Sequence, residues 1–263
     1  MKEPSTQPLV GFFVTCLADL YRPEVAFASI KLLELAGCRV EVPSQQTCCG
    51  QPAFNSGDNK NAAALAKQTI AAFADYEYVV GPSGSCIGML HHYPELFEER
   101  DPWKQRALDL KARAFEITSF LVDVRDFTQI QSRFQGQVTY HDSCSGLREL
   151  KIKQQPRQLL AQIPGLTLTE MEDAETCCGF GGTFCVKYPD ISNRMVSNKA
   201  ESVHQTGAEL LLGGDLGCLL NMAGKLSREG RRVAVRHVVE ILADEFAQPA
   251  LGQAADASLA YPA

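Results

Sequence analysis

The sequence predicts an α/β fold of two tandem pseudo-symmetric lobes, each a small parallel Rossmann-like sheet flanked by helices. Short apolar runs, typical of buried parallel strands, alternate with segments whose apolar residues recur at helical spacing. The same order of strands, helices and cysteines occurs twice within 263 residues. We place the first lobe at 8–125, the second at 136–246, and a flexible tail of small and polar residues at 247–263.

The first lobe begins with the apolar run LVGFFVT at 9–15, which indicates a buried strand. Apolar residues then recur at helical spacing over 24–35, with Pro23 at the start and Gly37 just past the end, which predicts a helix. The further expected elements are a strand at 38–42, a helix at 58–73, a strand at 78–80, a helical stretch at 87–114 broken by Pro94 and Pro102, and a short extended piece running into a helix at 115–124.

The second lobe repeats this order. Its expected elements are strands at 137–140, 167–171 and 209–212, a helix beginning at 155, a helix at 190–207, and the segment 233–246, which echoes 115–124 in position and pattern. Parallel strands joined by right-handed helical crossovers bring their carboxyl ends to one edge of the sheet, where such folds bind their ligands.

Eight of the ten cysteines form two matching sets of four. Each set is built on a vicinal pair followed by glycine, at 48–50 and at 177–179. One more cysteine lies 32 or 33 residues before the pair, and another lies 37 or 40 residues after it. Because these positions follow predicted strands, three loops should bring four thiols together in each lobe. The sets are Cys16, Cys48, Cys49 and Cys86, and Cys144, Cys177, Cys178 and Cys218.

Clustered cysteines in a cytosolic chain indicate metal or redox chemistry more often than disulfides. Structural zinc sites usually draw two sulfurs from a C-x2–4-C knuckle, which neither set contains. Vicinal cysteines reach two different metal atoms more readily, which favours an iron–sulfur cluster over zinc or metal-free thiol chemistry. Gly50 and Gly179 would let the backbone pass close to a bulky cluster. Of the remaining cysteines, Cys38 is expected in the core, and Cys185 is either a buried thiol or a spare ligand.

Composition and charge disfavour several partners. A net charge of −6 argues against a nucleic-acid-binding surface, and no apolar run approaches the roughly 18–20 residues of a membrane span. The apolar stretch at 9–18 is not expected to be a signal peptide, because Lys2 and Glu3 cancel and charged residues precede the only cleavage-like site. We therefore expect a cytoplasmic protein. Residues 11–16 lack G-x-G-x-x-G, so no dinucleotide site is predicted.

The spacings Cys16-x31-CysCysGly and Cys144-x32-CysCysGly resemble the CCG cysteine-rich domain, C-x31–38-CCG-x33–34-C-x-x-C. That domain occurs twice in the cysteine-rich subunit of heterodisulfide reductase, and also in iron–sulfur subunits of anaerobic glycerol-3-phosphate and glycolate oxidation. The resemblance spans 8–246. Within the family, four strings are similar to the lactate utilization proteins: QTCCGQPAFNSG (46–57), YHDSCSGLREL (140–150), TCCGFGGTF (176–184) and LSREG (226–230).

The resemblance implies that the eight cysteines bind one or two iron–sulfur clusters of the 4Fe–4S type, and it assigns no catalytic residue. It implies an electron-transfer subunit of a cytoplasmic complex that oxidises L-lactate to pyruvate. Such an oxidoreductase subunit would be active only with its partners, a ferredoxin-like iron–sulfur protein and a third subunit. The alternatives are a heterodisulfide-reductase-like thiol/disulfide oxidoreductase, an iron–sulfur subunit of a related glycolate or glycerol-3-phosphate system, and a zinc-stabilised scaffold.

The chain departs from the family pattern at the final C-x-x-C, where Ser83 and Asp215 stand in place of the first cysteine. Each set therefore has four thiols where heterodisulfide reductase has five, which is compatible with an ordinary cubane and argues against disulfide cleavage. Ser83 and Asp215 could supply an oxygen ligand or serve as turn residues. His141 and Arg148, near the second set, are candidates for proton handling and charge neutralisation, with ordinary structural roles as the alternative.

Overall fold

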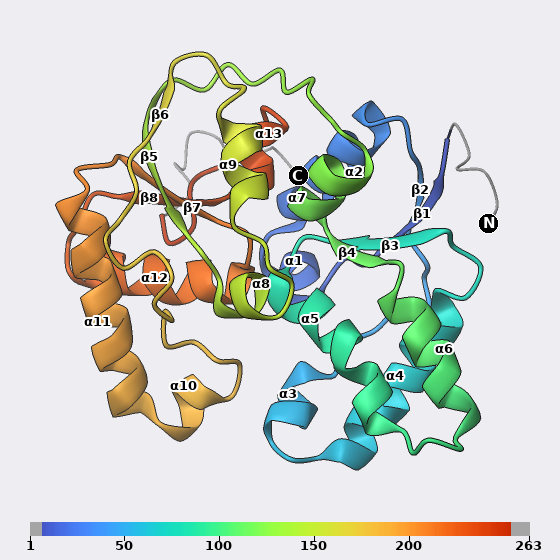
Figure 1. Ribbon diagram of the computed structural model, residues 1–263. Coiled ribbons are helices and arrows are strands. Elements are labelled where there is room, and N and C mark those ends of the chain that lie inside the picture. The colour runs from blue at the N-terminus through green and yellow to red at the C-terminus, as the bar shows by residue number, and fades with distance from the viewer. Residues whose placement is uncertain (1–6, 254–263) are drawn as a thin grey trace, which may run out of the picture.

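The computed structural model describes residues 7–253 and confirms the predicted α/β fold class. It contains two four-stranded sheets, ordered β2-β1-β3-β4 and β6-β5-β7-β8, in which all paired strands are parallel. The first sheet lies at the right of Figure 1 and the second at the left, with helices around both. The two halves of the chain therefore share one topology.

The first sheet consists of β1 (Leu9–Phe12), β2 (Arg39–Glu41), β3 (Tyr78–Gly81) and β4 (Ala114–Glu116). Its helices are α1 (Cys16–Tyr21), α2 (Pro23–Leu35), α3 (Gln51–Asn55), α4 (Asn59–Ala72), α5 (Gly84–His92), the 3-10 helix η1 (Tyr93–Leu96), α6 (Pro102–Lys111), α7 (Ile117–Ser119) and the π-helical turn η2 (Phe120–Val124). Proline at the first position favours α2 and α6, because its fixed φ suits a helix and its missing N–H is not needed there.

The second sheet consists of β5 (Gly136–His141), β6 (Leu166–Leu168), β7 (Leu210–Gly213) and β8 (Ala234–His237). Its helices are α8 (Cys144–Arg148), α9 (Gln154–Leu160), α10 (Phe184–Lys187), α11 (Pro189–Gln205), α12 (Leu216–Arg228) and α13 (Val238–Leu242). Each of β1 and β5 is followed after three or two residues by the short helix that begins with the first cysteine of its set.

The predicted strands and long helices are present, but five helices lie where the sequence pattern predicts none. Four of these, α1, α3, α8 and α10, have six residues or fewer, which is too short to show a helical period. The fifth, α12, begins inside the loop expected around Cys218 and is capped by Asp215. The strand predicted at 167–171 is β6 at Leu166–Leu168; Thr169 still donates to the Val138 carbonyl, and Glu170 then pairs with Arg157 of α9.

One hydrophobic core runs through both halves. Its larger cluster of buried side chains includes Val10 and Leu32 from the first half and Val138, Leu211 and Met222 from the second. A smaller cluster of buried residues comes from the first half alone. The helix pairs α2–α13 and α5–α8 join the halves (Figure 1). The lobe boundaries at 8–125 and 136–246 stay predictions.

The C-terminal segment is described up to residue 253, and the rest of the tail predicted at 247–263 lies outside the described residues. Leu251 is buried, and its backbone N–H donates to the carbonyl of Val235 at 2.9 Å. Over residues 7–253, none of the helices combines the length and the apolar character needed to cross a bilayer.

A buried ion pair links the N-cap of α2 to α13. The guanidinium of Arg22 donates to Glu240 Oε1 at 2.5 Å, and the Glu240 side chain is fully buried. Arg236 also approaches this oxygen, at 3.3 Å. The other oxygen of Glu240 accepts from the His237 N–H at 2.9 Å, completing a capping box at the start of α13. The Glu240 carboxylate therefore both caps α13 and joins the two halves of the chain through Arg22.

Replacing Arg22 with Met is expected to lower the free energy of unfolding by about 3 kcal/mol, because Glu240 loses its shortest partner while remaining buried. The magnitude is at the low end for such pairs because Arg236 stays close. The control is Lys31→Ala, which removes an exposed pair with Glu245 and should cost less than about 1 kcal/mol. Urea denaturation measures both; equal losses would contradict the prediction.

Candidate metal centre

In each sheet, thiols lie just past the carboxyl ends of neighbouring strands. Cys16 is the first residue of α1, which follows β1, and Cys86 lies in the first turn of α5, which follows β3. Cys144 and Cys218 occupy the same places after β5 and β7. Because β1 and β3, like β5 and β7, are hydrogen-bonded neighbours, these pairs of thiols start from one edge.

The vicinal pair completes the first set. Hydrogen bonds connect the thiols in the order Cys16, Cys48, Cys49, Cys86. Donation from Cys16, and then from Cys49, lowers the pKa of Cys48, while the pKa values of Cys16 and Cys49 are raised by the same hydrogen bonds and by burial. The backbone N–H of Gly50 also donates to the Cys48 sulfur, at 3.5 Å. Cys48 is therefore the favoured thiolate of this set.

The second set reproduces this pattern. Hydrogen bonds run in the order Cys144, Cys177, Cys178, Cys218, and those from Cys144 and Cys178 lower the pKa of Cys177. The N–H of Gly179 donates to the Cys177 sulfur at 3.4 Å. All ten cysteines lie within the described residues, and each is a free thiol. The convergence expected from the strand order is thus present in both halves.

Both glycines that follow the pairs have positive φ, +87° at Gly50 and +86° at Gly179. Their surroundings differ. A Cβ at Gly50 would meet its nearest atom, Leu65 Cβ, at 3.5 Å, an ordinary contact. A Cβ at Gly179 would lie 2.8 Å from the carbonyl oxygen of Ser192 at the start of α11. The second turn therefore packs its backbone directly against a helix.

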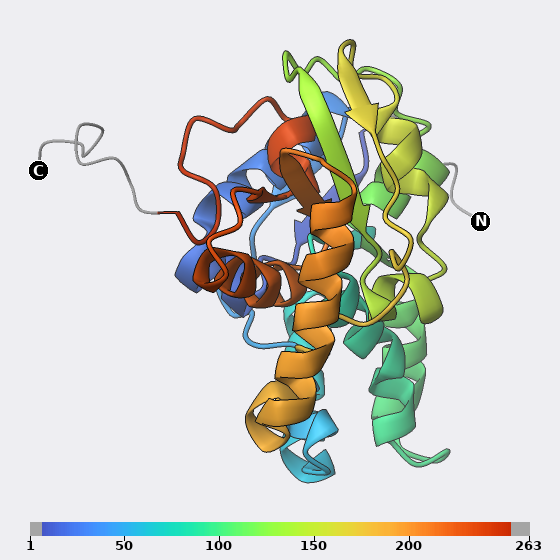
Figure 2. The same ribbon diagram turned by 90° about the vertical axis from the view of Figure 1, so that its left-hand side faces the viewer.

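A cavity of about 230 Å³ adjoins the first set. All four thiols of that set line it, and the opposite wall comes from the second half of the chain, with Phe180, Val186 and Leu216. The segment around Gly182 reaches across to α3, and Figure 2 shows α10 at the foot of α11. Four convergent sulfurs beside such a space fit a polynuclear metal–thiolate group such as an iron–sulfur cluster.

Ser83 and Asp215 serve as N-caps of α5 and α12. Ser83 Oγ accepts from the Cys86 N–H at 3.2 Å, and Asp215 Oδ1 accepts from the Gly217 N–H at 3.1 Å. The two side chains also meet, since Ser83 Oγ donates to Asp215 Oδ2 at 3.2 Å and the Ser85 N–H donates to the same oxygen at 2.9 Å. Their hydrogen bonds thus cap helices and join the halves.

His141, the last residue of β5, is buried at 1% exposure. One of its ring nitrogens and the sulfurs of Cys178 and Cys218 are three possible ligand atoms that all lie within 4.8 Å of one another. Burial, and then the positive charge of Lys199, lower the pKa of His141 to about 3, so the imidazole is neutral. Arg148, at the end of α8, is exposed.

The two cysteines outside the sets differ in their surroundings. Cys38 is buried just before β2, as expected for a core residue. Cys185, in α10, is half-buried and donates to the carbonyl of Gly182 at 3.4 Å.

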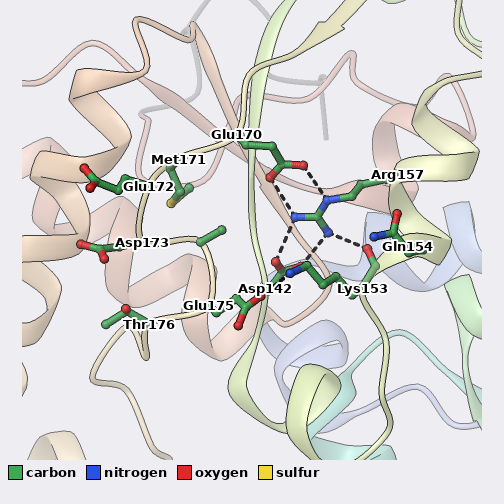
Figure 3. A pocket seen from close by; sticks show the side chains of 11 residues that line it. Asp142, Lys153, Gln154, Arg157, Glu170, Met171, Glu172, Asp173, Glu175 and Thr176 are labelled. Carbon is green, nitrogen blue, oxygen red and sulfur yellow. Dashed lines mark hydrogen bonds and ion pairs between the residues drawn. The ribbon is translucent and has the colours of Figure 1, made fainter.

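A second cavity, of about 490 Å³, opens beside the segment that leads to Cys177 (Figure 3). Arg157 lies across it and donates to both oxygens of Asp142, at 2.8 and 2.9 Å, and to Glu170. Asp142 is thereby fixed two residues before Cys144. No sequence pattern pointed to Arg157, because an arginine in an amphipathic helix is usually exposed.

Lys199 is a second buried charged residue that the sequence prediction did not include. It lies on the buried face of α11 at 1% exposure, and its ammonium group donates to the carbonyl of Asp173. Burial lowers its pKa, while nearby Asp173 and Cys178 oppose that shift. A signal existed, since Lys199 falls on the stripe formed by Val196, Ala200 and Val203, where a lysine is out of place.

Glu116, the N-cap of α7, is a buried carboxyl at the junction of the halves. Oε2 accepts from the Thr118 N–H at 2.8 Å, whereas Oε1 has no hydrogen-bond partner among residues 7–253. Desolvation raises its pKa to about 7 despite these donors. It lines a cavity of about 10 Å³ together with Tyr140 and Gly214, space for a single water.

Two comparisons bear on this arrangement. The model of the family described as "CCG: Cysteine-rich domain" matches residues 10–91 and 138–223, one match for each set of cysteines. The chain belongs to this family. This CCG chain is also similar to curated relatives named "Lactate utilization protein A". The one from Oceanobacillus iheyensis is 49% identical over 89% of this chain and 96% of its own, and the one from Halalkalibacterium halodurans is 46% identical with the same coverage.

A solved structure supports the fold of the two CCG repeats. The crystal structure of a hypothetical protein from Helicobacter pylori aligns with 91% of this chain, with a TM-score of 0.65 and 9% sequence identity. The alignment covers 51% of that chain, so the Helicobacter protein is about twice as long as the aligned region. At this identity the likeness concerns the fold alone.

Alanine at the two glycines should have unequal effects. Gly50→Ala is expected to cost about 1–2 kcal/mol of stability, because a non-glycine residue is forced to positive φ. Gly179→Ala should cost roughly 1–3 kcal/mol more, because its Cβ overlaps the Ser192 carbonyl. Chemical denaturation of the two variants checks this ranking, and an equal or reversed order would show that Gly179 is not packed against α11.

Glu116 predicts a pH dependence. Its pKa is raised from 4.5 to about 7, so the folded state binds a proton that the unfolded state has lost. The associated stability is present below pH 4.5 and decreases as the pH rises through 7, by about 3 kcal/mol in total. Glu116→Gln should abolish this decrease, while the exposed Glu172→Gln should keep the wild-type curve. Denaturation midpoints from about pH 4.5 to 8 measure it, and parallel curves for Glu116→Gln and wild type would contradict the assignment.

Proposed function

We propose that this chain is the iron–sulfur electron-transfer subunit of a complex that oxidises L-lactate to pyruvate, with one cluster of the 4Fe–4S type in each CCG repeat. One observation carries the cluster assignment: in each repeat, three loops deliver four thiols into one hydrogen-bonded series at a sheet edge. The lactate assignment rests on the names of the relatives, which match nearly the whole chain.

The residues around the thiols suit a negatively charged metal–thiolate group. When bound, an iron–sulfur cluster supplies one-electron transfer. Cys48 and Cys177 have lowered pKa values and so present thiolates first. The N–H groups of Gly50 and Gly179 donate to these sulfurs and stabilise their negative charge. Cys86 and Cys218 lie in the first turns of α5 and α12, where the helix dipole favours negative charge.

The chain's part in the reaction is electron relay. In this proposal the eight cysteines are ligands, none of them is catalytic, and lactate oxidation takes place in the complex formed with a ferredoxin-like iron–sulfur protein and a third subunit. The proposal includes a cytoplasmic location, which is supported by the number of free thiols, since thiols stay reduced in that compartment. Arg148, exposed beside the second set, is available to neutralise charge at that surface.

Cysteine variants test the ligand assignment. Cys48→Ser is expected to lose the cluster of the first repeat, about half of the iron and sulfide, and Cys177→Ser that of the second, because hydroxyl oxygen is a poor substitute for thiolate. Cys38→Ser, which alters a buried thiol outside both sets, is the control and should keep the full content. The measurement is iron, sulfide and zinc analysis after anaerobic reconstitution, with EPR of the reduced protein.

The same experiment separates the alternatives. Full iron and sulfide in Cys48→Ser and Cys177→Ser would refute the ligand sets. Stoichiometric zinc without iron in anaerobically purified wild-type protein would favour the zinc-stabilised scaffold. Turnover of a small disulfide by the isolated chain would favour the thiol/disulfide oxidoreductase.

A further inference from the structure

His141 differs from the other histidines of the chain, all five of which lie in the described residues. Neither of its ring nitrogens makes a well-aligned hydrogen bond with residues 7–253, although both are buried; the Ala174 carbonyl lies close enough to favour an N–H on one of them. By contrast, His91 bonds to the Ala114 carbonyl, His92 to Glu95, and His237 to the Pro82 carbonyl, while His204 is exposed. Burying an unpaired polar group costs about 1–3 kcal/mol. An imidazole left in this state implies a partner that the protein atoms do not supply.

The place of His141 indicates what that partner is. The imidazole ends β5, three residues before Cys144, at the edge where the second set converges. Its ligand atom and the sulfurs of Cys178 and Cys218 lie within 4.8 Å of one another, and all three residues are buried. A neutral imidazole beside thiolates is a donor set used by zinc, iron and copper.

The first repeat lacks this group. Val10 pairs with Tyr78 in the first sheet as Val138 pairs with Leu210 in the second, so β1 and β5 correspond residue by residue. Phe13 then occupies the position of His141, three residues before Cys16, and it is fully buried in the apolar cluster of the first half. The imidazole is therefore not a requirement of the fold at that position.

We propose that His141 is a metal ligand of the second repeat, joining Cys178 and Cys218 through a ring nitrogen, so that the two CCG repeats hold metal with different donor sets. This inference rests on the proposed metal-binding function of the cysteines. The lone pair of one ring nitrogen is donated to the metal, and the other nitrogen keeps its hydrogen. His141 is then a fifth donor beside the four thiols of the second set, whereas Phe13 offers no donor atom at the corresponding position of the first.

Pulsed EPR of the reduced, cluster-loaded protein with 15N-labelled histidine tests the proposal. Wild type should show one nitrogen with the strong hyperfine coupling of a directly bonded ligand, and the label should change that coupling. His141→Phe, which installs the residue found in the first repeat, should lose the signal and shift one of the two reduction potentials. The matched control, His204→Phe, alters an exposed histidine and should retain the nitrogen signal and both reduction potentials.

The wild-type spectrum decides the matter even if His141→Phe fails to fold. Only weak coupling, or none, in a protein that contains iron and sulfide would overturn the ligand assignment and leave the proposed function intact. If the wild-type chain binds no iron, the proposed function fails, and 113Cd loaded into the reduced chain then tests His141 separately. Scalar coupling between 113Cd and a 15N of His141 would support the ligand assignment, and its absence would refute it.

Discussion

Thiol–thiol contact at the carboxyl edge of each sheet is the interaction around which the candidate metal site is built. It requires three loops to meet, and the strand order achieves this because β1 pairs with both β2 and β3. The loops after these three strands carry all four cysteines of the first set, and β5 with β6 and β7 does the same for the second. Left-handed backbone at Gly50 and Gly179 then turns each vicinal pair toward the edge.

Contacts between the two halves of the chain connect the two sheet edges that carry the thiols. Asp215 caps α12 and accepts from the Ser85 N–H of the other half, so one carboxylate fixes the starts of two cysteine-bearing helices. The segment around Phe180 covers the first set from the second half. The environment of the first four thiols is therefore completed by the second repeat, which gives a physical reason for both repeats to reside in one chain.

The sequence predicts the frame well and the surroundings of the sulfurs poorly. Short apolar runs that alternate with segments of helical period predict both sheets, because the buried residues of a strand or long helix recur at a regular spacing. The matched cysteine spacings predict which thiols meet. Caps and buried charges leave no periodic trace: Ser83 and Asp215 proved to be helix caps joined across the halves, and nothing in the pattern around Arg157 indicated its bond to Asp142. The sequence marks His141 as a candidate, but only the structure shows that its buried ring nitrogens lack well-aligned hydrogen bonds.

Two differences between the repeats make the surroundings of the second set of thiols more polar than those of the first. Phe13 in the first repeat corresponds to His141 in the second. The carbonyl of Ala62 faces Gly50 as the carbonyl of Ser192 faces Gly179. Thr69 therefore corresponds to Lys199, because each lies seven residues further along its helix. An aromatic hydrocarbon and a hydroxyl are thus replaced by an imidazole and a buried cation. A nearby cation stabilises added negative charge, so an electron is held more favourably beside Lys199 than beside Thr69. In the proposed relay with one cluster in each repeat, unequal surroundings would give the two clusters different affinities for the electron, and so a direction that two identical sites would lack.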